Sequence, residues 1–148
     1  ALSERSYPKG RKSPVILTPH PGELARITGK TVAEVNENRI QLASDYAISH
    51  HVTVVLKGMN TVIAFPDGTG FVNVTGNRGL SKGGTGDTLT GILLGMASQG
   101  YQPSTAANAV YLHGKTAELY AEEKAPSSML ASDIMQIWPV LLRKLELS

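Results

Sequence analysis

The apolar positions of the chain form two kinds of pattern, short continuous runs and longer stretches with helical spacing. Val15-Ile16-Leu17 is a short run that stops at Pro19, and Val52 to Leu56 is a β-branched, almost wholly apolar run. Both predict buried strands, and the second is typical of a strand covered by helices on both faces. Two further runs, Thr61 to Phe65 and Phe71 to Val74, flank a Pro- and Gly-containing turn and predict a hairpin, the one clear antiparallel pair.

Helical spacing appears between and after these runs. Thr31-Val-Ala-Glu34 has capping-box spacing, and apolar residues then recur at near-helical intervals up to His50, so we predict one amphipathic helix there. The order of strand, helix, strand, hairpin and then helices predicts an α/β fold. The other predicted helices are Glu23 to Ile27 (ended by Gly29), Leu89 to Met96, Ala106 to Glu123 and a last segment capped by Ser132-Asp133.

Composition narrows the functional class. The chain has 148 residues, 41% of them apolar and 18% charged, which fits one ordinary globular domain. Fourteen Lys and Arg against twelve Asp and Glu give 14 − 12 = +2, and the charges are scattered, so we expect no nucleic-acid partner. The absence of cysteine suits a reducing compartment, and no apolar stretch approaches the roughly 18 residues that span a bilayer. We therefore expect a cytoplasmic protein without a membrane partner.

The strongest chemical signal is Gly83-Gly84-Thr85-Gly86-Asp87, which leads into a predicted helix. Glycines let a ligand approach the backbone, and the first N–H groups of a helix lie at the positive end of its dipole, so this segment predicts a phosphate site. A Walker A loop is excluded because Thr85-Gly86 stands where Lys-Ser/Thr is required, and Leu89 occupies the third glycine position of the dinucleotide fingerprint. The alternative is a flexible loop with an aspartate cap.

Asp87 has two interpretations. A carboxylate in the first turn of a helix is favoured by the dipole, so the residue could simply cap the helix. Beside a phosphate site, the same carboxylate could act as a general base that takes the proton from an attacking substrate hydroxyl.

His20 and Lys57 both follow predicted strands, where α/β proteins place their ligands. His20 lies between two prolines that restrict its backbone, yet it could also cap the next helix. Glu23 could orient a metal-bound water or start that helix, and the residues leave both open. His50, His51 and His113 show no converging set of metal ligands, so we interpret them as structural or surface residues.

With these residues in place, the chain resembles the ADP/ATP-dependent NAD(P)H-hydrate dehydratases of the ribokinase-like superfamily. The His-Pro-Gly-Glu element separates this family from sugar and vitamin kinases, which share mainly the Gly-Thr-Gly-Asp element. Arg78 and Lys82 depart from the residues often seen in the loop and add positive charge. The matching motifs are Thr18-Pro-His-Pro-Gly-Glu23, Lys57-Gly-Met-Asn-Thr61, Gly76-Asn-Arg-Gly-Leu-Ser-Lys-Gly-Gly-Thr-Gly-Asp-Thr-Leu-Thr-Gly91 and Ser132-Asp133.

The resemblance implies a ribokinase-like three-layer sandwich with a mainly parallel sheet. Family members carry a further N-terminal half before a segment that ends in Asp-Ala-Leu, and Ala1-Leu2 resembles the tail of that segment. Residues 1–148 are therefore expected to form a partial domain, its C-terminal half. We expect this half to need the missing N-terminal half, and we expect a homo-oligomer.

The resemblance also implies a reaction. NADHX or NADPHX, the hydrated nicotinamide nucleotides, would be dehydrated by phosphorylation of the ring hydroxyl at the expense of ADP or ATP, followed by loss of phosphate. Mg²⁺ would shield the phosphate charge, with ligands that the sequence does not assign. By motif, His20 and Asp87 would contact the hydrate, and Asp87 would be catalytic. The nucleotide-binding residues would be Lys57, Gly58, Met59, Asn60, Thr61, Gly83, Gly84, Thr85 and Gly86.

Two other functions use the same residues. A ribokinase-like kinase for a vitamin precursor would share the Gly-Thr-Gly-Asp element but release a stable phosphate ester, and His20-Pro-Gly-Glu23 argues against it. A non-enzymatic nucleotide-binding or assembly module would bind nucleotide without turnover.

Overall fold

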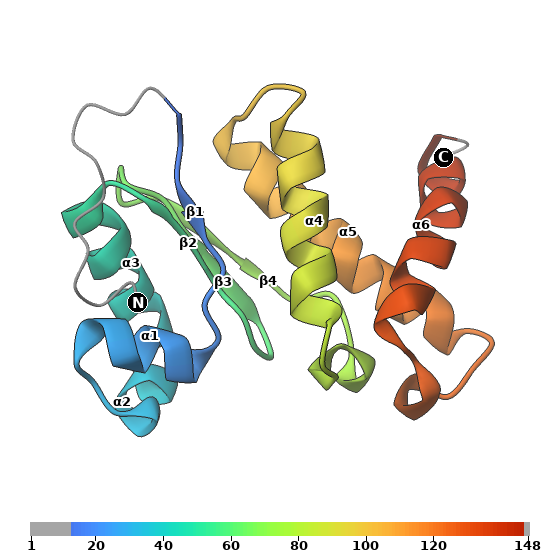
Figure 1. Ribbon diagram of the computed structural model, residues 1–148, viewed down its shortest axis with the longest axis horizontal. Helices are drawn as coiled ribbons and strands as arrows, with labels where there is room; N and C mark the ends of the chain where they lie inside the picture. Colours follow the sequence, from blue (N-terminus) through green and yellow to red (C-terminus); the bar gives the residue numbers. More distant parts are fainter. Residues whose placement is uncertain (1–12, 147–148) are drawn as a thin grey trace. The chain divides into compact units, whose positions relative to one another are not determined.

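The computed structural model describes residues 13–146, which divide into two compact units between Val72 and Asn73 (Figure 1). We call residues 13–72 the first unit and residues 73–146 the second unit. The interpretation of Ala1-Leu2 as the end of a preceding segment lies outside the described residues. None of the helices within 13–146 is long and apolar enough to cross a membrane.

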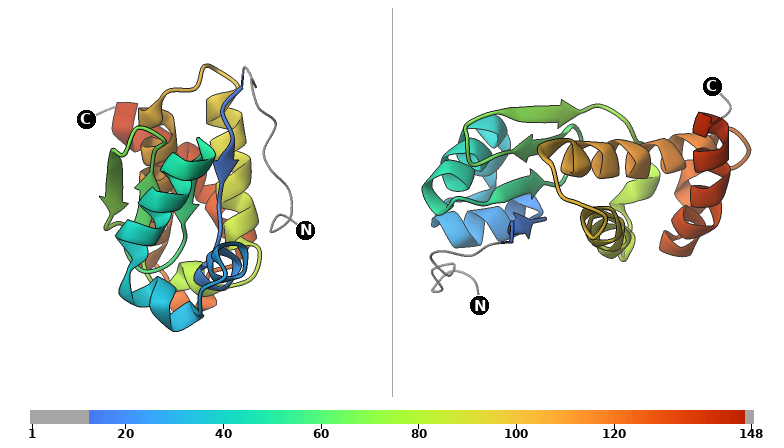
Figure 2. Two further views of the ribbon diagram at one scale, coloured as in Figure 1. Left: turned by 90° about the vertical axis from the view of Figure 1, so that its left-hand side faces the viewer. Right: turned by 90° about the horizontal axis from the view of Figure 1, so that it is seen from above.

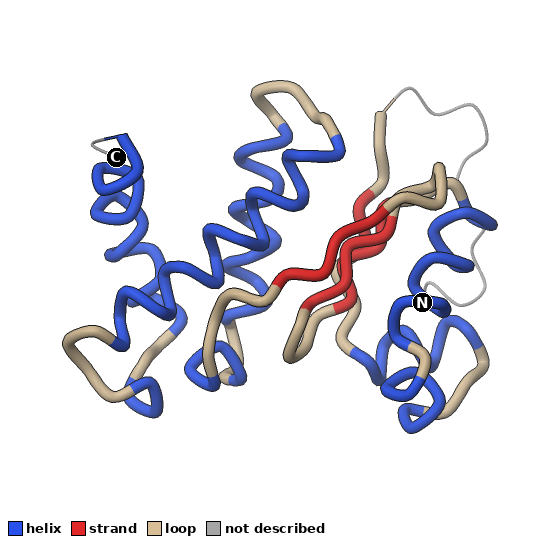
Figure 3. The backbone as a smooth tube through the Cα atoms, turned by 180° about the vertical axis from the view of Figure 1, so that it is seen from behind, coloured by secondary structure: helices blue, strands red, loops and turns tan. Residues whose placement is uncertain are grey.

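A mixed four-stranded sheet of order β1-β2-β3-β4 forms the centre of the first unit (Figure 3). Ile16 and Leu17 of β1 pair in parallel with Thr53 and Val54 of β2, as the strand pattern predicts. The helices and this sheet confirm the α/β prediction. The bounds are β1 Ile16–Leu17, β2 Thr53–Leu56, β3 Thr61–Ala64 and β4 Gly70–Asn73.

The hairpin of β3 and β4 is not the only antiparallel element, so that prediction was wrong. β2 also pairs antiparallel with β3, with Val55 opposite Ile63. The physical reason is the connection between them: Gly58 has φ +146° and Asn60 has φ +58°, and these left-handed conformations turn the chain back beside β2. The segment Lys57 to Asn60 is therefore a turn at one end of the sheet.

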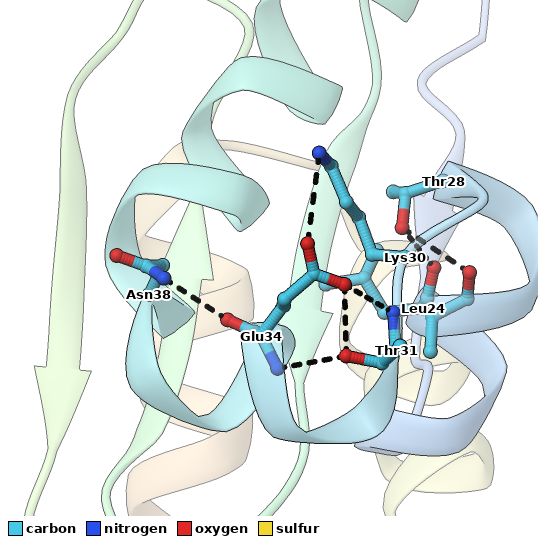
Figure 4. Close-up of polar contacts among 7 residues, drawn as sticks. Leu24, Thr28, Lys30, Thr31, Glu34 and Asn38 are labelled. Carbon is cyan, nitrogen blue, oxygen red and sulfur yellow. Dashed lines mark hydrogen bonds and ion pairs between the residues drawn. The ribbon is translucent and has the colours of Figure 1, made fainter.

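Three helices belong to the first unit: α1 Pro21–Thr28, α2 Val32–Glu37 and α3 Arg39–His50. The single helix predicted from Thr31 to His50 is broken at Asn38, whose φ of −125° and ψ of 39° are not helical. Its backbone amide donates to the Glu34 carbonyl at 3.1 Å, and its side-chain amide donates to the same carbonyl at 3.2 Å, so Asn38 is the C-cap of α2 (Figure 4).

The predicted capping box does start α2. The Glu34 amide donates to the Thr31 hydroxyl at 3.2 Å, and the Thr31 amide donates to the Glu34 carboxylate at 2.7 Å (Figure 4). The Thr31 amide and the Thr31 hydroxyl both donate to the Glu34 carboxylate, and these two hydrogen bonds lower the pKa of Glu34. The helix end is thus fixed by its own local sequence.

The core of the first unit forms where helices meet the sheet, and α3 packs across β2 and β3 (Figure 2). All four residues of β2 are buried. The packed core residues are Leu24, Ala25, Val35, Ala43, Tyr46, Ala47, Val52, Val54, Leu56, Val62 and Ala64.

The second unit is helical, and α5 packs against both α4 and α6 (Figure 1). Helix α4 begins at Thr85, earlier than the predicted Leu89, and its N-cap is Gly84. A short 3-10 helix, η1, lies within the segment that we predicted as loop. The bounds are η1 Arg78–Ser81, α4 Thr85–Ala97, α5 Pro103–Ala121, η2 Pro126–Ser128 and α6 Ala131–Glu146.

Candidate functional site

Two segments carry the predicted site residues, one in each unit. The first lies where β1 and β2 end. The Lys57 amide donates to the Pro19 carbonyl at 2.8 Å, which ties the two strand ends together. His20 and Lys57, far apart in sequence, are thereby brought to the same end of the sheet, as predicted.

His20 is the N-cap of α1. Its Nδ1 accepts hydrogen bonds from the amides of Gly22 at 3.1 Å and Glu23 at 3.2 Å. In the neutral ring the proton is therefore assigned to Nε2. The capping interpretation is thus right for Nδ1, while Nε2 lies 3.7 Å from the Glu23 carboxylate on a side chain that is 57% exposed. One ring can cap the helix and still offer Nε2 to a ligand.

Glu23 connects His20 to Lys57. One oxygen of its carboxylate accepts the His20 amide at 2.6 Å and lies 3.7 Å from the Lys57 ammonium. Glu23 therefore starts helix α1 and also holds a cation beside the strand end. The sequence left the role of Glu23 open, and the structure supports the alternative in which it starts the helix.

The turn from Lys57 to Asn60 follows β2 directly and leads into β3. The Thr61 hydroxyl donates to the Gly58 carbonyl at 3.1 Å and closes the turn. The Met59 side chain is 91% exposed. The turn therefore projects its tip into solvent while its two ends remain bonded to the sheet.

Sequence reasoning missed Arg39, the first residue of α3. Its Nη2 donates to the carbonyls of Leu56 at 3.1 Å and Lys57 at 3.3 Å. Burial lowers the pKa of this guanidinium. A signal was present: Val35, Asn36, Leu42 and Ala43 stand at the positions three and four residues away, so no acid can pair with Arg39 along its own helix.

The second segment is the glycine-rich entry to α4. Gly84 has φ +87°, a left-handed conformation that favours glycine, and open space surrounds Gly83 where a Cβ would be. The amides of Gly83, Gly84 and Gly86 donate to no residue within 13–146. Unpaired amides at the positive end of a helix are suited to an anion, as the motif predicts.

Asp87 lies in the first turn of α4 and is exposed. Asp87 is not the N-cap, because that position is Gly84 and no side-chain hydrogen bond caps the helix; its place in the first turn, favoured by the helix dipole, is as predicted. The Asp87 carboxylate makes no hydrogen bond or ion pair with another described residue. The unpaired Gly86 amide can donate a hydrogen bond to an anion, and the carboxylate of the next residue, Asp87, can accept a proton.

Hydrogen bonds of the buried residues Thr85 and His113 stabilise the start of α4. The hydroxyl of Thr85 lies 2.7 Å from the carbonyls of both Leu80 and Lys82, so this predicted nucleotide-binding side chain serves the loop itself. The Thr85 carbonyl lies 3.0 Å from His113 Nε2 of α5. Burial lowers the pKa of His113 to about 4, which keeps the ring neutral near pH 7 and confirms its structural role.

The loop before α4 is anchored to its own unit as well. The Asn77 side chain donates to the Ala117 carbonyl at 2.6 Å, and the Gly76 amide donates to Glu118 at 2.9 Å. The Lys82 ammonium donates to the Ser127 carbonyl at 2.5 Å, so this added charge is held by η2. The loop is ordered by contacts with α5 and η2 rather than left flexible.

The described part of the chain holds no group of three or more His, Asp or Glu side chains that could bind a metal ion. A metal that arrives with phosphates needs only one or two carboxylates. Asp87 is the one acidic residue between positions 80 and 100.

Comparison with known proteins gives a consistent result. The family model described as NAD(P)H-hydrate dehydratase matches residues 1–140. The chain is 50% identical to the ADP-dependent (S)-NAD(P)H-hydrate dehydratase of Bacillus subtilis, over 99% of this chain and 53% of that protein. It is 44% identical to the bifunctional NAD(P)H-hydrate repair enzyme of Moorella thermoacetica, over 93% of this chain and 26% of that protein.

Solved structures agree. The Bacillus subtilis ADP/ATP-dependent NAD(P)H-hydrate dehydratase co-crystallised with ATP and Mg²⁺ matches with a TM-score of 0.92 and 49% identity, over 97% of this chain and 52% of that one. A ribokinase-like superfamily protein of Enterococcus faecalis matches with a TM-score of 0.75 and 33% identity, over 88% of this chain and 44% of that one. The chain thus has a ribokinase-like fold and spans about half the length of the first of these relatives.

Proposed function

The chain belongs to the NAD(P)H-hydrate dehydratase family, and we propose that it serves the nucleotide-dependent dehydration of NADHX or NADPHX to the reduced nicotinamide nucleotide, a hydro-lyase reaction. The observation that carries the proposal is the uncommitted Asp87 carboxylate next to the unpaired amide of Gly86. This pair offers a proton acceptor and an anion donor at neighbouring backbone positions.

In the proposed mechanism, Asp87 takes the proton from the ring hydroxyl of the hydrate while that oxygen attacks the terminal phosphorus of ADP or ATP. The amides of Gly83, Gly84 and Gly86 hold the charge that develops on the transferring phosphoryl group. The carbon–oxygen bond of the resulting phosphate ester then breaks, the neighbouring carbon loses a proton, and the ring double bond is restored. With ADP the products are the reduced nicotinamide nucleotide, AMP and phosphate.

The first segment supplies contacts for the two substrates. We propose that the turn from Lys57 to Thr61 binds the nucleotide and that Nε2 of His20 contacts the hydrate. The Glu23 carboxylate holds Lys57 and His20 near each other until the ligands bind. Relatives with names that specify ADP, and one co-crystallised with ATP and Mg²⁺, support the nucleotide assignment.

Mg²⁺ would be held mainly by phosphate oxygens and water, which suits a chain whose described residues contain no acidic cluster. It would supply shielding of the phosphate charge. A homo-oligomer in the cytoplasm remains a prediction.

The test replaces Asp87 by Asn in the full protein. General-base catalysis is worth about 10²- to 10⁴-fold, so single-turnover dehydration should fall at least about 10²-fold while ADP affinity stays within about threefold. Dehydration is followed by the near-ultraviolet absorbance of the reduced nicotinamide. Near-normal turnover in Asp87→Asn would overturn the catalytic role.

A second readout separates the kinase alternative. A vitamin kinase would consume nucleotide and accumulate a stable phosphate ester, with no gain in near-ultraviolet absorbance. The relatives named as an NAD(P)H-hydrate dehydratase and as an NAD(P)H-hydrate repair enzyme favour dehydration, with a gain in absorbance, over the kinase.

A further inference from the structure

Arg39 holds the end of β2 in place. This residue begins α3, and its Nη2 reaches across 18 sequence positions to the Lys57 carbonyl at 3.3 Å and also to the Leu56 carbonyl at 3.1 Å. It lies so close to the following residue that a Cβ at Gly58 would be 2.9 Å from two guanidinium nitrogens. The guanidinium therefore fills the space that a side chain at position 58 would need.

The position of Arg39 is electrostatically unfavourable for its own helix. A cation in the first turn meets the positive end of the helix dipole. Within residues 13–146, no acidic side chain forms an ion pair with Arg39. Its hydrogen bonds to the strand end are thus the favourable interactions that the structure describes for this charge.

These bonds fix the orientation of a backbone amide. In a planar trans peptide the carbonyl and the N–H point in opposite directions. The Lys57 carbonyl faces Arg39, so the Gly58 N–H points away from the guanidinium, and this amide donates to no described residue. The Lys57 amide, in the preceding peptide, is fixed on the other side by the Pro19 carbonyl.

We propose that Arg39 is a positioning residue for the turn from Lys57 to Asn60, which it locks in the conformation that presents the Gly58 amide to a phosphate oxygen of the nucleotide. This inference rests on the proposed function for the nucleotide. It differs from a pure charge effect because one nitrogen of the planar guanidinium group, Nη2, donates from a fixed position to both carbonyls.

The test compares three variants of the full chain. Arg39→Met removes the planar guanidinium group and its charge, and Arg39→Lys keeps the charge but loses the planar group. Arg26→Met is the matched control: Arg26 lies on α1, is exposed and makes no hydrogen bond or ion pair with a described residue. ADP and ATP affinities are measured by calorimetry, and amide hydrogen exchange is followed at Lys57, whose amide donates to the Pro19 carbonyl.

We expect Arg39→Met to weaken nucleotide binding at least tenfold and to accelerate exchange of the Lys57 amide at least tenfold. In the complete enzyme, KM for the nucleotide should rise while kcat at saturation changes less than threefold. Arg39→Lys should lose most of the same affinity, and Arg26→Met should stay within twofold of wild type. A merely structural arginine would lower the unfolding midpoint and leave nucleotide affinity unchanged.

Full affinity in Arg39→Lys, or unchanged exchange of the Lys57 amide in a folded Arg39→Met, overturns the positioning role. If Arg39→Met does not fold, Arg39→Lys alone shows whether the planar guanidinium group or only the positive charge is needed. Failure of the wild-type protein to bind ADP or ATP would instead overturn the proposed nucleotide function, and hydrogen exchange would still test whether Arg39 orders the turn.

Discussion

The two units support their candidate segments by different physical means. In the first unit, His20, Glu23 and Lys57 are linked by an ion pair and backbone hydrogen bonds among side chains that are 57%, 50% and 27% exposed. In the second unit, the start of α4 is held by Thr85 and His113, which are 4% and 6% exposed. Exposed ion pairs contribute little to stability, whereas buried hydrogen bonds are costly to break.

We therefore expect the first segment to be adaptable and the second to be rigid. The first segment can rearrange at little cost when a ligand competes for Lys57 or Glu23. The second segment keeps its free amides and Asp87 in one arrangement because its neutral supports are buried. A phosphoryl-transfer site needs its charge-stabilising amides fixed before the reaction, which suits the second arrangement. The following changes probe the contrast, beginning with the largest expected effect.

Gly114→Ala should destabilise the second unit the most. A Cβ at position 114 of α5 would overlap the Thr75 hydroxyl and lie 2.8 Å from the Thr75 carbonyl. Overpacking of this kind costs roughly 2–3 kcal/mol. Thermal unfolding followed through the fluorescence of Trp138, the single tryptophan of the chain, measures the loss.

The matched control is Gly91→Ala, also inside a helix. No atom lies within 4 Å of a Cβ at that position, so the substitution should stabilise α4 by about 0.5–1 kcal/mol. Equal unfolding midpoints for the two variants would contradict the packing argument.

Acid should weaken the second unit through His113. Its folded-state pKa of about 4 lies below the ordinary 6.5, so between these values the unfolded chain binds a proton that the folded chain does not. The stabilising contribution is complete above pH 6.5, falls as the pH drops toward 4, and amounts to at most about 3 kcal/mol. His113→Gln keeps an N–H donor but removes this titration.

The measurement is the difference in unfolding free energy between wild type and His113→Gln from pH 7.5 to 3.5. Other acids titrate in both proteins and cancel. A difference that stays constant over this range would show that His113 does not couple folding to pH.

The sequence predicted elements whose causes are local. The cap of α2 depends on Thr31 and Glu34, and the uncapped start of α4 depends on Gly83 and Gly84. These signals lie within a few residues of the structure that they produce, so they could be read without knowledge of the fold.

The features that the sequence did not predict depend on local backbone conformations that compete with the apolar pattern, or on contacts between residues far apart in the sequence. Apolar periodicity continues through Asn38, although the non-helical backbone of this residue ends the helix there. The left-handed backbone at Asn60 carries no strong sequence signal, so the pairing of β2 with β3 was missed. The lack of an acidic partner along its own helix marks Arg39 in the sequence, but its acceptors are backbone carbonyls of another element, which no residue type identifies.

The smallest effect on stability is expected in the exposed cluster of the first unit. Lys57→Ala removes a 3.7 Å ion pair with Glu23, a contact worth about 0–1 kcal/mol at a partly exposed site. Unfolding should therefore change little, whereas ADP affinity should fall about tenfold if Lys57 binds phosphate, because a charge-assisted hydrogen bond is lost. Glu23→Gln is the matched control, since it breaks the same pair but leaves the ammonium free for nucleotide. ADP affinity that falls equally in both variants would mean that the ion pair, and not the lysine itself, shapes the nucleotide site, and the exposed cluster would then be as preorganised as the buried one.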